Sequence, residues 1–310
     1  MNTSRLLRAG AGIALSACTV AALAACSTAS NASTSSGSGT ITVVAAENFW
    51  GSIAKQLGGS HVTVTSIITN PDTDPHSYEP TAADGRTIAS AQFAVVNGIG
   101  YDPWATKLLD ANPSSGRTAL TVGQLVGIPD GGNPHRWYSP DNVHQVIEQI
   151  SADYQKIDPA DASYFAQQKQ IFETQTLAPY NTLISDIKAK YAGTPIGASE
   201  SIVTPLAEGL GLKMLTPESF LDAISEGNDP TVADKATIDS QIRNKQIKVY
   251  VYNSQNSTPD VQAQVDEAKA AGIPVTTVTE TLVPANATFQ DWQAGELRGI
   301  EAALAQATGK

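Results

Sequence analysis

Short β-branched runs alternate with helical patterns in two separate stretches of the chain, and this alternation limits the possible folds more than any other feature. Strands are predicted at residues 41–46, 61–68 and 93–98 in the first stretch and at 194–199, 248–253 and 273–279 in the second. Five helices are predicted between and after these strands. The first ends at the glycines 58–59, the second covers 87–91, the third passes through 206–210, and the last two cover 260–271 and 289–307. Strands that are separated by helices favour parallel sheets built from βαβ units.

A long helical segment lies between the two α/β stretches. Residues 139–191 have helical patterns almost throughout, with a division at Asp158-Pro159, and Pro179 is predicted to kink the long second part. We therefore expect an α/β fold with two lobes, residues 41–157 and 192–310, each with a mainly parallel sheet. A long linking helix, residues 158–191, joins them, and a cleft between lobes is a usual place for a ligand.

The first forty residues have the pattern of an export signal followed by a tether. Arg5 and Arg8 precede an apolar stretch over residues 9–25, which ends in Leu-Ala-Ala-Cys at Cys26. This ending resembles the bacterial lipobox, which predicts a signal peptide of residues 1–25 and lipidation of Cys26. The alternative is an ordinary signal with a chance cysteine. Residues 27–40 contain no apolar side chain larger than Ala, which predicts a flexible tether.

Charge and cysteine content exclude several classes of protein. The 310 residues contain 19 Lys and Arg against 30 Asp and Glu, a formal net charge of −11, which argues against nucleic-acid binding. Two cysteines, Cys18 and Cys26, are too few for a disulfide framework or a Cys-rich zinc site. No stretch after the signal has the roughly 18 consecutive apolar residues of a membrane span. We expect an extracytoplasmic protein, anchored to the cell membrane by lipid without crossing it.

Two of the four histidines occur in matched loop sequences. His76 lies in NPDTDPHSYEPT and His135 in GGNPHRWYSPDN, each directly after a proline and with another proline beyond it. The flanking prolines stiffen the loop and fix the direction of the imidazole, which favours a ligand site. His61 and His144 have no such setting and are interpreted as structural or solvated residues.

Two acids occupy equivalent positions in the second α/β stretch. Glu200 and Glu280 each come directly after a predicted buried strand, where ligands gather in open α/β folds. If the cleft binds a cation, this half of the chain must supply oxygen ligands, because it has no histidine. The alternative is that each acid interacts with the dipole of the helix that follows.

Together these segments resemble the manganese- and zinc-binding receptors of bacterial ABC importers. HSYEPTAADGRTIASAQFAVVNGIGYDPW, beginning at His76, is similar to the family's first metal-ligand segment, and NFW at residues 48–50 also fits its pattern. NPHRWYSPDN is similar to the second segment, although Asn133 and Ser139 replace two Asp residues. GASES and IPVTTVTET are similar to the third and fourth segments, and Glu280 stands where the family usually has Asp.

The resemblance implies a ligand set and a mode of action. The expected metal ligands are His76, His135, Glu200 and Glu280, around one transported divalent ion between two lobes joined by a rigid helix. It also implies a lipoprotein, here a monomer, that delivers the ion to the membrane permease of an ABC importer. Two carboxylates able to bind through both oxygens slightly favour Mn²⁺ over Zn²⁺, with Fe²⁺ as a third option.

This ligand set has two chemical consequences. Two neutral imidazoles and two carboxylates balance the charge of a divalent ion, and protonation of the imidazoles at low pH should weaken binding. Aromatic residues near the ligand segments either exclude water from the site or belong to the core: Trp50, Tyr78, Trp137 and Tyr138.

Two other functions would use the same ligands. A secreted metallo-hydrolase would need a general base, for which Glu79 is the candidate, but the chain contains neither H-E-x-x-H nor G-x-S-x-G. A surface adhesin would use the metal as a structural element. We expect a binding protein and no enzyme.

Overall fold

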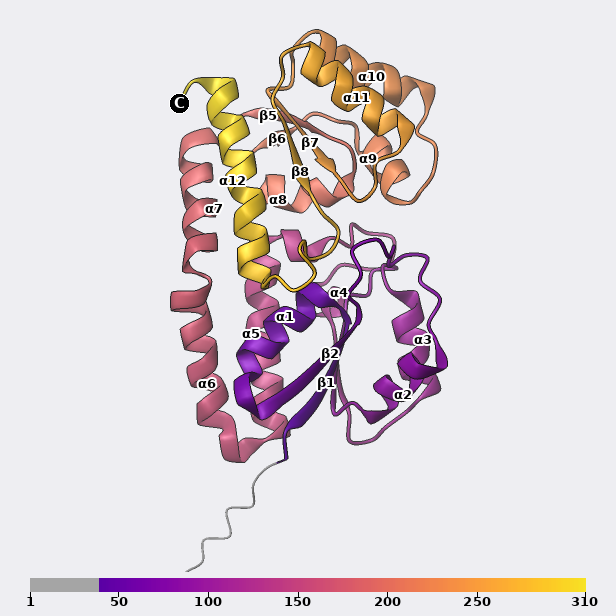
Figure 1. The fold of residues 1–310 in the computed structure, drawn as a ribbon, viewed down its shortest axis with the longest axis vertical. Coiled ribbons are helices and arrows are strands. Elements are labelled where there is room, and N and C mark those ends of the chain that lie inside the picture. Colours follow the sequence, from indigo (N-terminus) through magenta and orange to yellow (C-terminus); the bar gives the residue numbers. More distant parts are fainter. Residues whose placement is uncertain (1–38) are drawn as a thin grey trace, which may run out of the picture. The chain divides into compact units, whose positions relative to one another are not determined.

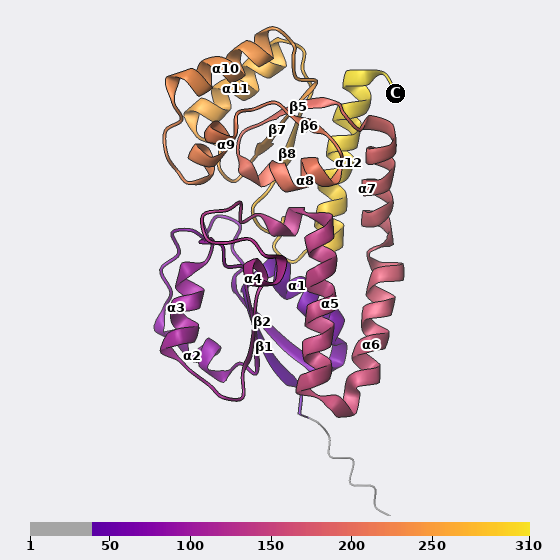
Figure 2. The ribbon, with the colours of Figure 1, turned by 180° about the vertical axis from the view of Figure 1, so that it is seen from behind.

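The computed structural model describes residues 39–310, which Figures 1 and 2 show from opposite sides. The predicted signal peptide, Cys26 and most of the predicted tether lie outside the described residues. Within residues 39–310, none of the helices combines the length and the apolar character that a membrane span requires.

The N-terminal lobe contains a four-stranded parallel sheet in the order β2-β1-β3-β4. Its strands are β1 (Ile41–Glu47), β2 (Val62–Ile68), β3 (Phe93–Val96) and β4 (Thr118–Thr121). Its helices are α1 (Asn48–Gly58), α2 (Ala82–Ser90), α3 (Pro103–Ala111), α4 (Val122–Val126) and α5 (Pro140–Ile157). In β1 only Thr42 is partly exposed, as expected for a central parallel strand that has helices on both faces.

The C-terminal lobe repeats this architecture with a second parallel sheet in the order β6-β5-β7-β8. Its strands are β5 (Pro195–Ala198), β6 (Lys213–Met214), β7 (Val249–Asn253) and β8 (Val275–Val278). Its helices are α8 (Thr204–Gly209), α9 (Glu218–Ser225), α10 (Val232–Arg243), α11 (Pro259–Ala270) and α12 (Phe289–Thr308). The predicted α/β fold with two parallel-sheet lobes is thus confirmed.

The linking segment consists of two helices, α6 (Ala162–Ile171) and α7 (Ala178–Tyr191), which run beside the two lobes in both views. A π-helical turn at Phe172–Thr176 separates them. Pro179 explains its position: the proline ring lacks an N–H and clashes with the carbonyl of residue 175, four positions earlier. The predicted interruption is therefore present, but it lies one turn before the proline.

α12 contacts both lobes. It packs along α7 and against β7 and β8, and it also contacts α1 of the N-terminal lobe. One hydrophobic cluster of buried side chains extends from Ile41 to Leu304 and includes residues of both sheets. The two lobes therefore share a continuous core.

Several elements were not predicted. The strands β4 and β6 and the helices α3, α9 and α10 carry weak or short patterns. α2 begins at Ala82, five residues before the predicted start, because Thr81 and Asp84 form a capping box that satisfies the first backbone N–H groups.

Candidate metal centre

The four predicted ligands all line one cavity. Glu200 and Glu280 follow the carboxyl ends of β5 and β8, His76 lies in the loop after β2, and His135 lies between α4 and α5. The cavity has a volume of about 210 Å³ and is lined by residues of both lobes. Its lining also includes the exposed acids Asp72, Asp74 and Glu226, and none of the lining residues within 39–310 is Lys or Arg.

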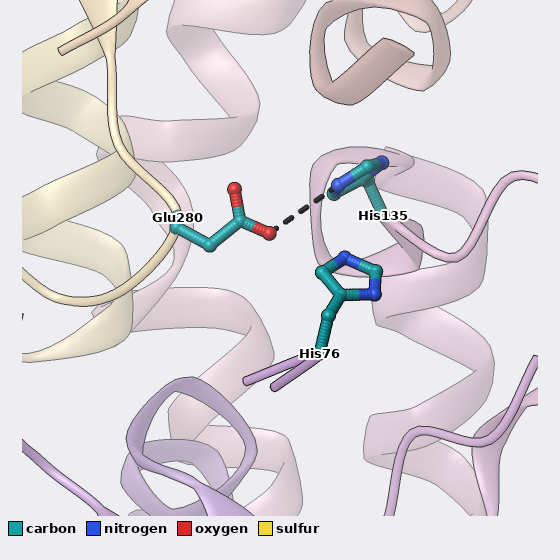
Figure 3. Close-up of side chains that lie close together, drawn as sticks. All are labelled: His76, His135 and Glu280. Carbon is teal, nitrogen blue, oxygen red and sulfur yellow. Dashed lines mark ion pairs between the residues drawn. The ribbon is translucent and has the colours of Figure 1, made fainter. Parts of the chain in front are cut away.

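Three of the four side chains form a tight group (Figure 3). His76, His135 and Glu280 each offer one ligand atom, and these atoms lie within 4.8 Å of one another. His135 Nε2 is 3.3 Å from Glu280 Oε1. Two imidazole nitrogens and a carboxylate oxygen at this spacing could hold a divalent transition-metal ion.

Asn133 orients the ring of the buried His135. The Asn133 Nδ2 group donates to Ser201 O at 2.7 Å, so its Oδ1 atom is the acceptor that lies 3.0 Å from His135 Nδ1. His135 Nδ1 must then carry a proton, so Nε2 is the ring atom that faces Glu280 and that would bind a metal ion. An asparagine thus supports the imidazole where the resembled family has an aspartate.

His76 is held mainly by its own loop. Its backbone N–H donates to Asp74 Oδ1 at 2.9 Å, and the carbonyl of Pro75 accepts from Trp104 Nε1 at 3.2 Å. The imidazole lies edge-on to the ring of Tyr101, with 4.7 Å between the ring centroids. The backbone of this loop is thus held by Asp74 and Trp104, and the imidazole packs against Tyr101.

Both carboxylate oxygens of Glu280 are hydrogen-bonded. Tyr101 Oη donates to Oε1 at 3.0 Å, and Asn253 Nδ2 donates to Oε2 at 2.9 Å. The Glu280 backbone N–H donates to Gln255 Oε1 at 2.6 Å. Tyr101 belongs to the N-terminal lobe and Asn253 to the C-terminal lobe, so the carboxylate is held from both sides.

Glu200 lies in the same cavity but outside the group of three. It is 2% exposed, and its Oε2 atom accepts from Asn256 Nδ2 at 3.0 Å. Its Oε1 atom has no hydrogen-bond partner among the described residues. An unpartnered buried carboxylate oxygen is unfavourable by itself, and a bound cation would satisfy it.

The site holds its ligands in different protonation states. Burial lowers the pKa of His76, although Glu280 opposes this effect, so the imidazole stays neutral. Burial alone would raise the pKa of Glu280, but His135, His76 and the Tyr101 hydroxyl bring it below its ordinary value. Burial, followed by the charge of Glu280, raises the pKa of Glu200. The pKa shifts of His76 and Glu280 favour the forms that bind a cation, whereas the raised pKa of Glu200 favours a protonated form that must lose its proton before it can bind.

Sequence reasoning missed two residues beside the site. Tyr101, which donates to Glu280, lies in the loop between β3 and α3, five residues after the end of β3, and no sequence pattern singles it out. Glu47, the last residue of β1, is fully buried, and burial together with Asp102 raises its pKa well above the ordinary value. It does not belong to the group of three.

The remaining residues that the sequence singled out lie outside the ligand group. His61 Nδ1 is 2.8 Å from Asp161 Oδ2, and His144 Nε2 is 3.3 Å from Asn181 Oδ1, so both have structural contacts. Trp50, Trp137 and Tyr138 are fully buried core residues, and Tyr78 packs edge-on against Trp104. Glu79 is exposed and does not line the cavity.

Two known metal-binding lipoproteins are similar in sequence. The manganese-binding lipoprotein MntA of Halalkalibacterium halodurans is 26% identical over 136 residues, covering 43% of this chain and 45% of the relative. The zinc-binding lipoprotein AdcA of Streptococcus pneumoniae R6 is 26% identical over 267 residues, covering 78% of this chain and 50% of the relative. The chain thus spans about half the length of these relatives.

A solved structure and a family model complete the comparison. A periplasmic metal-binding protein from Candidatus Liberibacter asiaticus superimposes with a TM-score of 0.72 and 24% identity, covering 85% of this chain and 99% of the other. The fold is therefore that of periplasmic metal-binding proteins. Residues 43–303 match the family described as zinc-uptake complex component A, periplasmic (ZnuA), and the chain belongs to this family.

Proposed function

We propose that the protein is the extracytoplasmic receptor of an ABC importer and that it captures one divalent transition-metal ion. The observation that carries the proposal is the group of His76, His135 and Glu280, whose ligand atoms lie within 4.8 Å of one another in a cavity between two lobes. Glu200 is the fourth ligand in this proposal, supported by its unpartnered oxygen at the same cavity. The ion is the transported cargo, which the receptor passes to a membrane permease.

The ligand set favours Mn²⁺ slightly over Zn²⁺, with Fe²⁺ as a further candidate. Two carboxylates and two imidazoles can supply more contacts than the four that Zn²⁺ prefers, and carboxylate oxygens suit Mn²⁺. The similar proteins named above include both a manganese-binding and a zinc-binding lipoprotein, which supports a divalent ion of this class.

The proposed location, outside the cytoplasm and at the cell membrane, is supported by the first residues of the chain. The lipobox-like sequence at Cys26 supports lipidation and attachment to the outer face of the cell membrane. In this arrangement the receptor works as a monomer near the permease.

Calorimetric titration of metal-stripped protein with Mn²⁺ and with Zn²⁺, in separate experiments, tests the proposal. The expected result is binding of one ion, which His76→Ala and His135→Ala each abolish or weaken by at least about 100-fold, with little change in the melting temperature of the metal-free protein. His144→Ala serves as the control, because His144 contacts Asn181 away from the cavity. One-to-one binding that survives both site substitutions would refute the proposed site.

A further inference from the structure

The two loops that carry His135 and Glu280 meet at a third side chain. Tyr138 lies three residues after His135, and Thr279 directly precedes Glu280. Both contact Glu296 on α12, which lies 16 residues after Glu280 and 161 residues after His135 in the sequence. A single carboxyl group therefore touches the loops of two proposed ligands from different lobes.

Thr279 is held to α12 at two atoms. Glu296 Oε1 accepts from the Thr279 backbone N–H at 2.9 Å. The Thr279 hydroxyl lies 2.9 Å from the same oxygen and 3.0 Å from the Thr281 carbonyl oxygen, and its one hydrogen can be donated to either. One turn earlier on the same helix, Trp292 Nε1 donates to Thr279 Oγ1 at 2.7 Å. The residue next to Glu280 thus has little freedom to move relative to α12.

Tyr138 joins the same network from the other loop. Its hydroxyl lies 2.8 Å from the Thr279 carbonyl oxygen and 2.5 Å from Glu296 Oε2. The hydroxyl has one hydrogen, which it donates to the Thr279 carbonyl oxygen, because a carbonyl can only accept. The contact with Glu296 is then a hydrogen bond as well when Glu296 is protonated and donates its proton to the Tyr138 oxygen. Burial raises the pKa of Glu296 to about 8, which agrees with a protonated group at neutral pH.

α12 is a firm support for this network. It is a 20-residue helix that packs along α7, and the rings of Tyr138 and Trp292 pack edge-on beside Glu296 with 5.7 Å between their centroids. An apolar side chain of similar size would fill this place at lower desolvation cost. The polar group is therefore explained better by the contacts that it makes than by packing.

We propose that Glu296 is a positioning residue that holds the His135 loop and the Glu280 loop at the spacing that one metal ion requires. The inference rests on the proposed function, because it assigns a role toward the same ion. Groups that orient metal ligands typically change metal affinity by about 10- to 100-fold when they are removed.

The experiment compares three substitutions in the full chain. Glu296→Ala removes the contacts to both loops, whereas Glu296→Gln can still accept from Thr279 and donate to Tyr138. Glu301→Gln is the control, because Glu301 lies on the same helix and forms a surface ion pair with Lys190. Affinity is measured for Mn²⁺ and Zn²⁺, and the visible absorption spectrum of bound Co²⁺ reports the coordination geometry. The melting temperature of the metal-free protein shows whether each variant is folded.

We expect Glu296→Ala to weaken metal binding about 10- to 100-fold and to change the Co²⁺ spectrum. Glu296→Gln and Glu301→Gln should stay close to the wild type in both measurements. If Glu296→Ala does not fold, Tyr138→Phe, which removes only the hydroxyl, should weaken binding and alter the spectrum.

Four results would count against these expectations. A folded Glu296→Ala variant with wild-type affinity and spectrum would overturn the inference, and so would an unaffected Tyr138→Phe variant if the alanine variant is unfolded. A glutamine variant that binds no better than the alanine variant would overturn the hydrogen-bond arrangement on which the inference depends. A wild-type protein that binds no metal would instead refute the proposed function.

Discussion

At the scale of single residues, the two acids of the cavity differ in charge. Glu280 accepts hydrogen bonds from Tyr101 and Asn253 and lies beside His135, which stabilises its carboxylate. Glu200 is buried, has one unpartnered oxygen, and is close enough to the charge of Glu280 for its pKa to be raised. The raised pKa of Glu200 favours its protonated form in the metal-free protein, so that a metal ion and a proton compete for it.

This difference predicts that metal binding releases a proton from Glu200. Coordination requires the carboxylate, so metal affinity should rise with pH until the raised pKa of Glu200 is passed. Calorimetric titrations at pH 7 in two buffers of different ionisation enthalpy measure the number of protons released. We expect Glu200→Gln to release about one proton fewer than the wild type and to bind the metal less tightly. Equal proton release from both proteins would show that the proton comes from another group.

The residue scale also shows which residues of the candidate site a sequence can reveal. His76 and His135 were predictable because prolines flank them in matched loops, and Glu280 because it follows an apolar strand. The roles of Tyr101 and Asn253 could not be predicted, since their contacts to Glu280 span 179 and 27 residues of sequence. Glu200 lies outside the group of three because of the direction of its side chain, which no sequence pattern specifies.

At the scale of elements, the close approach of α8 to the start of α5 supports the His135 loop. Gly209, the last residue of α8, faces the ring of Pro140, the first residue of α5. A Cβ atom at position 209 would lie 2.6 Å from Pro140 Cδ and 2.8 Å from Pro140 Cγ. The proline ring is fixed to the backbone and cannot move aside, so the two helices require a glycine here.

Gly209→Ala is therefore expected to destabilise the metal-free protein by about 1–3 kcal/mol, because the added methyl group overpacks this contact. Urea denaturation measures the free energy of unfolding. Gly295→Ala is the matched control: position 295 lies within α12 with no atom within 4 Å of the added Cβ, so the helix should gain about 0.5–1 kcal/mol. Equal stability of the two variants would contradict the assigned helix contact.

The elements themselves were predictable to the extent that their patterns were strong. The apolar runs of β1, β3 and β7 are long enough to be recognised, whereas β6 contains only Lys213 and Met214. β4 has the sequence TALT, which has a single fully buried residue. The hydrogen bonds of such strands come from their neighbours in the sheet, so tertiary packing and not local sequence determines them.

At the scale of the whole molecule, the continuous core does not depend on a metal ion. The hydrophobic cluster extends through both lobes, and the proposed ligands lie at a cavity beside it. The placement of the lobes could not be predicted, because it depends on contacts such as Tyr138 with Thr279, which are 141 residues apart.

We therefore expect the metal-free protein to remain folded, in contrast to an adhesin with a structural metal. After treatment with a chelator, circular dichroism should show nearly unchanged helix content and a single cooperative melting transition. Added metal should then raise the melting temperature, with a stabilisation of about 2.7 kcal/mol at 100 times the dissociation constant. Loss of helix content on chelation would instead indicate that the ion is part of the folded framework.

The lining of the cavity has a consequence for the chemical form in which the cargo arrives. Among the described residues that line it, the titratable side chains are acids and imidazoles, with neither Lys nor Arg. Citrate and phosphate, which bind transition metals in solution, are anions, and the acidic side chains of the cavity repel them electrostatically. For the proposed function we therefore expect the ion to dissociate from these small-molecule carriers outside the protein, so that the receptor binds hydrated metal and not the intact complexes.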